Sequence, residues 1–127
     1  MIKIQNCQNL KTVQSGAFSD NRELIDIDIS NNENLAVIED NAFGDLPNLS
    51  DLKLEHNQLS RISLKGIPLQ SLLLTGNAWT CDCHLLPLQN LLNNLSSVQN
   101  RSSVRCAKPY RVRGYQMLSV ELAGCAE

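Results

Sequence analysis

Short stretches in which hydrophobic and polar residues alternate recur along the first part of the chain. Ile27 and Ile29 alternate with acidic residues, and Leu52 and Leu54 alternate with charged residues in the same way. Such alternation predicts a short β-strand with one buried face. An asparagine follows each stretch, and further apolar residues come after it. The pattern therefore predicts several one-sided strands that are joined by longer turns.

These stretches are copies of one repeated frame. The frame, a leucine followed by two alternating apolar residues and then an asparagine, begins at Leu24, Leu49 and Leu69. An incomplete copy precedes them and has Cys7 at the asparagine position. The strand positions of successive copies lie 25, 25 and 20 residues apart. Because one unit cannot bury its apolar face alone, the units are expected to stack into a solenoid.

Two other positions in the repeat have roles that follow from their chemistry. The asparagine at the turn leaving each strand can form hydrogen bonds with backbone groups of the neighbouring coil, which a buried loop would otherwise leave unpaired. Phe18 and Phe43 lie 25 residues apart, each after an alanine. We expect them to stack on the outer, convex side of the solenoid.

Residues 1 to about 78 resemble the leucine-rich repeat family, since its consensus recurs four times in one register. The resemblance implies an α/β fold, a right-handed solenoid of about three and a half repeats with a short parallel sheet on its concave side. In that family the turn position holds Asn or Cys. Cys7 is therefore expected to be a buried, poorly accessible free thiol, and the alternative is an unpaired reactive cysteine.

The repeat ends after Asn77, and a different pattern follows. Leucines recur every three or four residues between Leu85 and Leu95, which predicts an amphipathic helix. Pro87 would lie in its first turn, where no backbone hydrogen bond is lost. Such a helix could cover the open end of the solenoid.

Five cysteines in so short a chain favour an oxidising compartment, although a metal site is an alternative for some of them. Cys81 and Cys83 are separated by one residue, a tight spacing for one zinc ion, and such neighbours rarely bond to each other. We expect disulfides and neither a metal nor a cofactor. The residues alone leave open how these two cysteines pair with Cys106 and Cys125.

This tail is similar to the cysteine-rich C-terminal cap of extracellular leucine-rich repeat proteins. The shared motifs are N-x-W-x-C-x-C-x-L-x-x-L, C-x-x-P, V-R-G and a final cysteine. The resemblance implies the pairs Cys81–Cys106 and Cys83–Cys125. It also divides the chain into repeats over residues 1–78 and a disulfide-bonded helical cap over residues 79–127.

Composition excludes several classes of function. The net charge of −2 lacks the basic excess of a nucleic-acid-binding protein, so no nucleic-acid partner is expected. No apolar stretch approaches the ~18 residues of a membrane span. His56 could approach Asp28 or Asp51, near Ser30, but a flat sheet offers neither an oxyanion site nor a pocket that excludes water. We therefore expect no enzymatic activity.

The outward positions of the strands would form the concave face, which such solenoids use for binding. We expect a protein ligand there, and a solvated face that binds nothing is the alternative. The expected contacts are centred on Asp28, Lys53, Glu55, His56 and Leu73. The full set that we assign to this face is Asp26, Asp28, Asn31, Asp51, Lys53, Glu55, His56 and Leu73.

The charges divide unevenly between the two parts of the chain, with a net charge of −4 over residues 1–80 and +2 over residues 81–127. The basic residues of the tail form a candidate patch for sulfated glycans or an acidic protein, or else a solvated loop. They are Arg101, Arg105, Lys108, Arg111 and Arg113. Three sequons for N-glycosylation, at Asn48, Asn94 and Asn100, agree with an extracellular setting.

Together these features predict an extracellular protein-recognition module, either in the ectodomain of a cell-surface receptor or adhesion protein or in a secreted matrix protein that binds glycosaminoglycan through its cap. The first copy lacks its opening leucine. We therefore expect an N-terminally incomplete chain that self-associates through the edge at residues 2–5. Ile2, Ile4, Leu10 and Phe18 would then be uncovered on one side.

Overall fold

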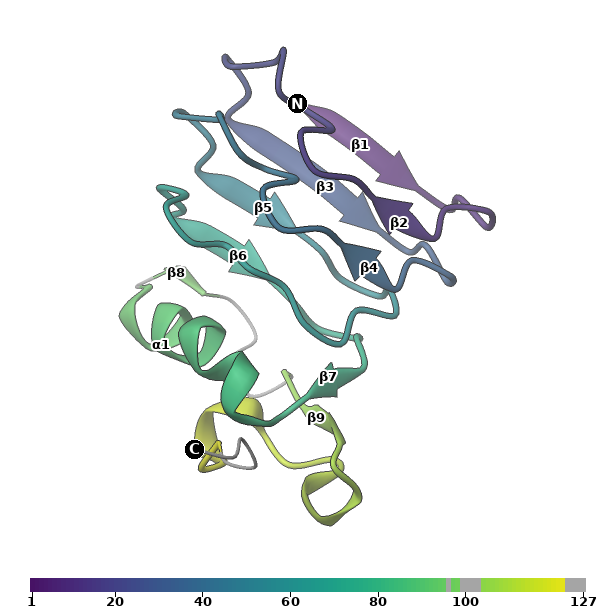
Figure 1. Ribbon diagram of the computed structural model, residues 1–127, viewed down its shortest axis with the longest axis vertical. Helices are drawn as coiled ribbons and strands as arrows, with labels where there is room; N and C mark the ends of the chain where they lie inside the picture. The colour runs from purple at the N-terminus through teal and green to yellow at the C-terminus, as the bar shows by residue number, and fades with distance from the viewer. Residues whose placement is uncertain (96, 99–103, 123–127) are drawn as a thin grey trace.

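The computed structural model describes residues 1–95, 97–98 and 104–122 of the chain. Successive coils stack side by side, and a cap closes one end (Figure 1). The strands are β1 (Ile2–Gln5), β2 (Thr12–Val13), β3 (Asp26–Ser30), β4 (Val37–Ile38), β5 (Asp51–Lys53), β6 (Ser71–Leu73), β7 (Trp79–Thr80), β8 (Ser97–Val98) and β9 (Cys106–Lys108). One α-helix, α1 (Leu86–Asn94), and 3₁₀ turns at Cys83–Leu85, Tyr110–Val112 and Met117–Ser119 complete the described elements.

The largest sheet is parallel, with the strand order β1-β3-β5-β6-β8. Its register matches equivalent positions of the repeat: Ile27 pairs with Ile2 on one side and with Leu52 on the other, and Leu52 pairs with Leu72. Ile27, Leu52 and Leu72 are at most 1% exposed. The predicted leucine-rich repeat solenoid is confirmed, and its core is built from the inward positions of these strands.

The convex side carries a smaller parallel sheet, β2-β4, and a pair of stacked aromatic rings. The ring centroids of Phe18 and Phe43 are 5.8 Å apart and the rings are nearly parallel, as predicted. The expectation that Phe18 would be uncovered on one side is wrong. Phe18 is buried, because Phe43 of the next coil lies against its ring.

Asparagine side chains connect the coils where the strands end. Asn57 is buried, and its Nδ2 donates to the carbonyls of Ile29 and Leu54 at 2.8 and 3.0 Å. Its Oδ1 accepts from the backbone N–H of Asn32 at 3.1 Å, and Asn32 in turn donates to Ile4. The predicted asparagine ladder is confirmed, and it pairs buried backbone groups that turns would otherwise leave unsatisfied.

β1 lies at the edge of the main sheet and carries the half-buried side chains of Ile2 and Ile4. Leu10 is also half-buried. An edge strand presents backbone groups that another chain can pair with. Self-association through this edge stays a prediction.

Within the cap, the helix α1 lies across the end of the main sheet (Figure 1). Leu88 and Leu92 are buried against the core, and Pro87 lies in the first turn, as the sequence predicts. The cap also continues the sheet, because β8 pairs with β6. No sequence pattern indicated this fifth strand. The division of the chain at residue 78 stays a proposal.

A disulfide connects the start of the cap to its later part. Cys81 is bonded to Cys106, the pair that the family resemblance implies, with a Cα–Cα distance of 5.7 Å. The adjacent strands β7 and β9 pair in parallel. Cys83 is also disulfide-bonded. Its expected partner, Cys125, lies outside the described residues, so the Cys83–Cys125 pair stays a prediction.

Candidate protein-binding site

The concave face is a set of side-chain rows that run across the strands. Lys3 of β1, Asp28 of β3, Lys53 of β5 and Leu73 of β6 are neighbours in register, so one row alternates cation, anion and cation before it ends on leucine. Neighbouring parallel strands lie about 4.8 Å apart, which places each side chain within reach of the next. Lys53 and Leu73 are half-exposed and Lys3 is exposed.

Asp28 does not take the role of a central contact that we predicted for it. Its side chain is buried, and both carboxylate oxygens are used within the protein. Oδ1 accepts from the Ser30 hydroxyl at 2.6 Å, and Oδ2 accepts from Gln5 Nε2 at 3.1 Å. The side chain is short and the longer Gln5 reaches it from β1, so the carboxylate of Asp28 is enclosed by its neighbours and little of it is open to a ligand.

The remaining acids give the face its charge. Asp26 and Asp51 are direct neighbours in register, and both are half-exposed, as is Glu55 just beyond β5. One carboxylate oxygen of Asp26, Oδ1, is buried without a hydrogen-bond partner in the described part of the chain. The solvent-accessible part of the concave face is therefore mildly acidic, and Leu73 is a half-exposed apolar side chain within it.

A row of residues whose backbone has the left-handed conformation, with positive φ, borders the concave face where the strands end. Asn6, Asn31, His56 and Gly76 occupy the same place in four successive coils, with φ values of 59°, 58°, 58° and 82°. His56 is exposed and lies across Gly76, where an added Cβ would come within 2.3 Å of His56 Nδ1. The absence of a side chain at Gly76 thus allows the imidazole of His56 to lie there.

The structure does not bring His56 together with an acid as a catalytic pair would require. Among the described residues, no hydrogen bond joins His56 to Asp28 or Asp51. The hydroxyl of Ser30 donates a hydrogen bond to Asp28 and not to His56. Within the same ranges, no group of three or more His, Cys, Asp or Glu side chains is placed to hold a metal ion.

The basic residues predicted for the cap lie on and around β9. Arg105, Lys108, Arg111 and Arg113 are all exposed, and the guanidinium of Arg105 also donates to the carbonyl of Gly114 at 2.7 Å. Arg101 lies outside the described residues. Of the sequon asparagines, Asn48 and Asn94 are exposed and Asn100 lies outside the described residues. Glycosylation and polyanion binding at these places stay predictions.

Cys7 is a free thiol, but the expectation that it is buried is wrong, because it is exposed. In later coils the side chain at this position is covered because it reaches back to the preceding coil, as Asn32 does to Ile4. Cys7 belongs to the first described coil, and none of the described coils covers its outer side. Its Sγ donates to the carbonyl of Gln5 in its own turn, at 3.4 Å.

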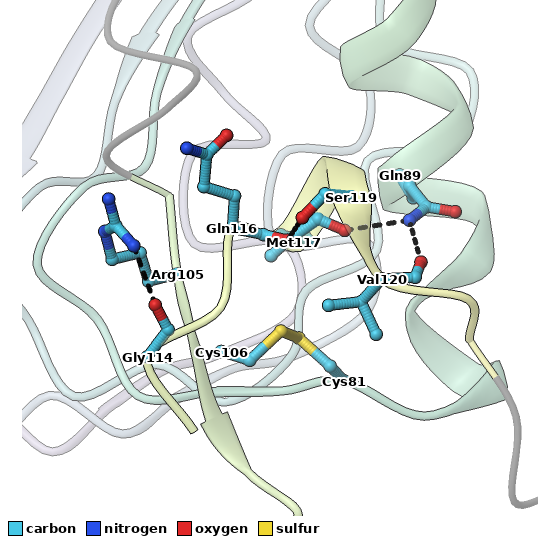
Figure 2. Close-up of a disulfide and its surroundings, with 9 residues drawn as sticks. All are labelled: Cys81, Gln89, Arg105, Cys106, Gly114, Gln116, Met117, Ser119 and Val120. Atoms are coloured by element: carbon cyan, nitrogen blue, oxygen red, sulfur yellow. Dashed lines mark hydrogen bonds between the residues drawn. A yellow bond between two sulfur atoms is a disulfide. The ribbon is translucent and has the colours of Figure 1, made fainter. Parts of the chain in front are cut away.

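Two side chains form hydrogen bonds that hold the cap in place, and sequence reasoning predicted neither set of partners. Gln89 of α1 donates to the carbonyls of Met117 and Val120, both at 2.9 Å (Figure 2). Trp79 is 1% exposed, and its indole N–H donates to the carbonyl of Leu74 at 3.1 Å. The N-x-W motif singled out Trp79 as a family residue, but no local signal indicated the partners of Gln89.

Comparison with known proteins agrees with this architecture. The family model described as leucine rich repeat matches residues 2–59 and 33–78. Trophoblast glycoprotein from Homo sapiens is 32% identical over 60 residues, which is 47% of this chain and 14% of that protein. The protein of the same name from Macaca fascicularis matches to the same extent. The chain thus spans about a seventh of the length of these curated relatives.

A solved structure is similar over nearly the whole chain. The crystal structure of human 5T4 (Wnt-activated inhibitory factor 1, Trophoblast glycoprotein) superposes with a TM-score of 0.77 at 26% identity, covering 96% of this chain and 46% of that one. In the described ranges of the present chain, no helix is long and apolar enough to cross a membrane. Disulfides form and persist in oxidising compartments, which agrees with the glycoprotein relatives. The chain belongs to the leucine-rich repeat family and is an extracellular recognition module with a disulfide-bonded C-terminal cap.

Proposed function

We propose that this module is part of the ectodomain of a cell-surface receptor or adhesion protein, and that it binds a protein ligand on the concave face. The observation that carries the proposal is the row in which Lys53 and Leu73 stand side by side, half-exposed, on a rigid sheet. An apolar side chain surrounded by polar groups is the usual arrangement of a protein-binding hot spot.

The chemistry of the face supports a protein ligand over a small molecule. Asp51, Glu55 and His56 present charged or hydrogen-bonding groups along a surface, in contrast to the enclosed, mostly apolar pockets that hold small ligands. The strands beneath these side chains are paired on both sides, so binding would order little backbone. The similar proteins are named as glycoproteins, and one of them is also named as an inhibitory factor, which supports a signalling role at the cell surface.

A secreted matrix protein that binds sulfated glycans is the alternative function. It is favoured only by the exposed cations Lys108, Arg111 and Arg113. Retention on a heparin column that persists in salt and is lost in the Arg111→Gln/Arg113→Gln variant would support this alternative.

The concave face is tested with a multimerised form of the chain, applied to a panel of cultured cells that includes trophoblast-derived lines and read by flow cytometry. The Glu55→Arg/Leu73→Ser variant should weaken binding at least ten-fold, because it reverses one charge and removes the apolar contact, a loss of about 1.4 kcal/mol or more. Thermal stability should stay within a few degrees of the parent.

Glu23→Arg is the matched control, since Glu23 is an exposed acid outside the concave face. This control should bind as the parent does. If Glu23→Arg weakens binding as much as the double variant, or if the double variant binds normally, the ligand does not contact the concave face.

A further inference from the structure

The cap carries an exposed loop, residues 108–115, that the concave face does not use; we name it the cap loop. It projects from the end of the molecule opposite β1 (Figure 1). Tyr110 is 85% exposed and Tyr115 is 58% exposed, and both are among the most exposed large hydrophobic side chains in the described part of the chain. Exposed aromatic residues that gather in one place mark candidate interaction surfaces.

The backbone of the cap loop is held at both ends. The Cys81–Cys106 disulfide fixes the strand from which the loop leaves. At the other end the N–H of Gly114 donates to the carbonyl of Cys106 at 2.8 Å, and the N–H of Cys106 donates to the carbonyl of Tyr115 at 2.9 Å. Arg105 adds a side-chain bond to Gly114, at 2.7 Å (Figure 2). A partner would therefore meet a loop whose backbone is already positioned, so that binding would order little backbone.

The same loop is positively charged. Lys108, Arg111 and Arg113 are exposed, and no Asp or Glu occurs between residues 104 and 120. Within the described ranges, the one ion pair joins Arg22 to Asp45, so none of these three cations is paired. The positive charge of the cap loop is complementary to an acidic surface and opposite in sign to the charge of the concave face.

We propose that the cap loop is a second protein-binding surface, which recognises an acidic protein segment with Tyr110 as its anchor. Tyrosine and arginine are the residue types enriched at protein-binding hot spots, and the loop presents two of each. A sulfated glycan would be held chiefly by the cations, and the exposed tyrosine rings would then contribute little. The partner differs in charge from any ligand of the acidic concave face, so one chain can hold both.

The probe is a phage library of random twelve-residue peptides, selected in parallel on the parent chain and on the Tyr110→Ser variant. The parent should enrich peptides with several Asp or Glu residues, and the variant should not. Tyr110 makes almost no contact with the rest of the chain, so its replacement should leave the melting temperature unchanged. The most enriched acidic peptide is then synthesised with a fluorophore and its affinity measured by anisotropy.

For this peptide we expect Tyr110→Ser and Arg111→Gln/Arg113→Gln each to raise the Kd at least ten-fold. Ile25→Ser, which removes a 56%-exposed apolar side chain elsewhere, should leave the Kd unchanged. Selection of peptides without an acidic bias would overturn the proposal, as would equal losses in Tyr110→Ser and Ile25→Ser. If no peptide is selected and the chain binds heparin in a way that needs the arginines but not Tyr110, the cap loop is a glycan-binding site and the proposal is rejected.

Discussion

At the scale of single residues, the left-handed turns at the strand ends depend on which side chains can adopt them. Asn6 and Asn31 belong to the few non-glycine types that enter this region readily, and Gly76 enters it without a steric cost. His56 is the least usual member of the row. Its ring lies over Gly76, which links the backbone of one coil to the side chain of the one before.

Gly76→Ala should lower the free energy of unfolding by about 2 kcal/mol or more, because alanine is strained at positive φ and its Cβ would overlap the His56 ring. Gly66→Ala is the matched control: its φ is 80°, but no atom lies within 4 Å of the added Cβ. That variant should lose only about 1 kcal/mol. Urea unfolding measures the free energy of unfolding of both variants. Equal losses in the two would mean that the contact with His56 contributes nothing to the cost of Gly76→Ala.

Asn57→Ala should lower the free energy of unfolding by about 3 kcal/mol, since it leaves the buried carbonyl of Ile29 and the N–H of Asn32 without their partner. Asn34 also joins two coils, through a bond from its Nδ2 to the carbonyl of Gln8 at 2.6 Å, but it is exposed. Asn34→Ala should therefore cost less than about 1 kcal/mol. Chemical denaturation of both variants would contradict the ladder argument if the two losses were similar.

At the scale of elements, the cap is stabilised by connections between segments that are distant in sequence. β7 pairs with β9 beside the disulfide, and Gln89 of α1 bonds to the backbone near Met117 and Val120. Met117 is itself fully buried. The helix covers the end of the solenoid, and the segment that follows β9 packs against the helix in turn (Figure 2).

Cys81→Ser/Cys106→Ser should lower the free energy of unfolding by about 3–4 kcal/mol, the chain-entropy value for a crosslink that closes 25 residues. Hydrogen exchange should rise over residues 104–120, which depend on this crosslink for their position. Cys7→Ser is the control, because Cys7 is exposed and free. An effect of Cys7→Ser on stability, or unchanged exchange in the cap of the double variant, would refute this account.

At the scale of the whole molecule, charge and shape separate the two candidate surfaces. The repeats are acidic and their outward side chains line the concave face, whereas the cap is basic and presents Tyr110 and Tyr115 at the far end. The cap loop lies at the end of the molecule opposite β1 (Figure 1). If both proposals hold, one chain can bind two partners of opposite charge at once.

Much of this architecture follows from local sequence signals. The 25-residue repeat determined the strand register, since Ile27 and Leu52 each lie one repeat from the residue they pair with. It likewise determined the asparagine ladder and the stacking of Phe18 on Phe43. These features depend on equivalent positions of neighbouring coils meeting each other, so the pattern of the repeat is sufficient to predict them.

Other features were decided only by tertiary structure. Asp28 and Lys53 have equivalent places in the repeat, yet Asp28 is buried because Gln5 and Ser30 enclose its carboxylate, while Lys53 is half-exposed. The pairing of β8 with β6 and the exposure of Tyr110 depend on how an irregular segment folds back onto the last coil. A repeating sequence determines contacts between its own copies, but contacts between unlike segments depend on side-chain lengths and packing that only the folded chain brings together.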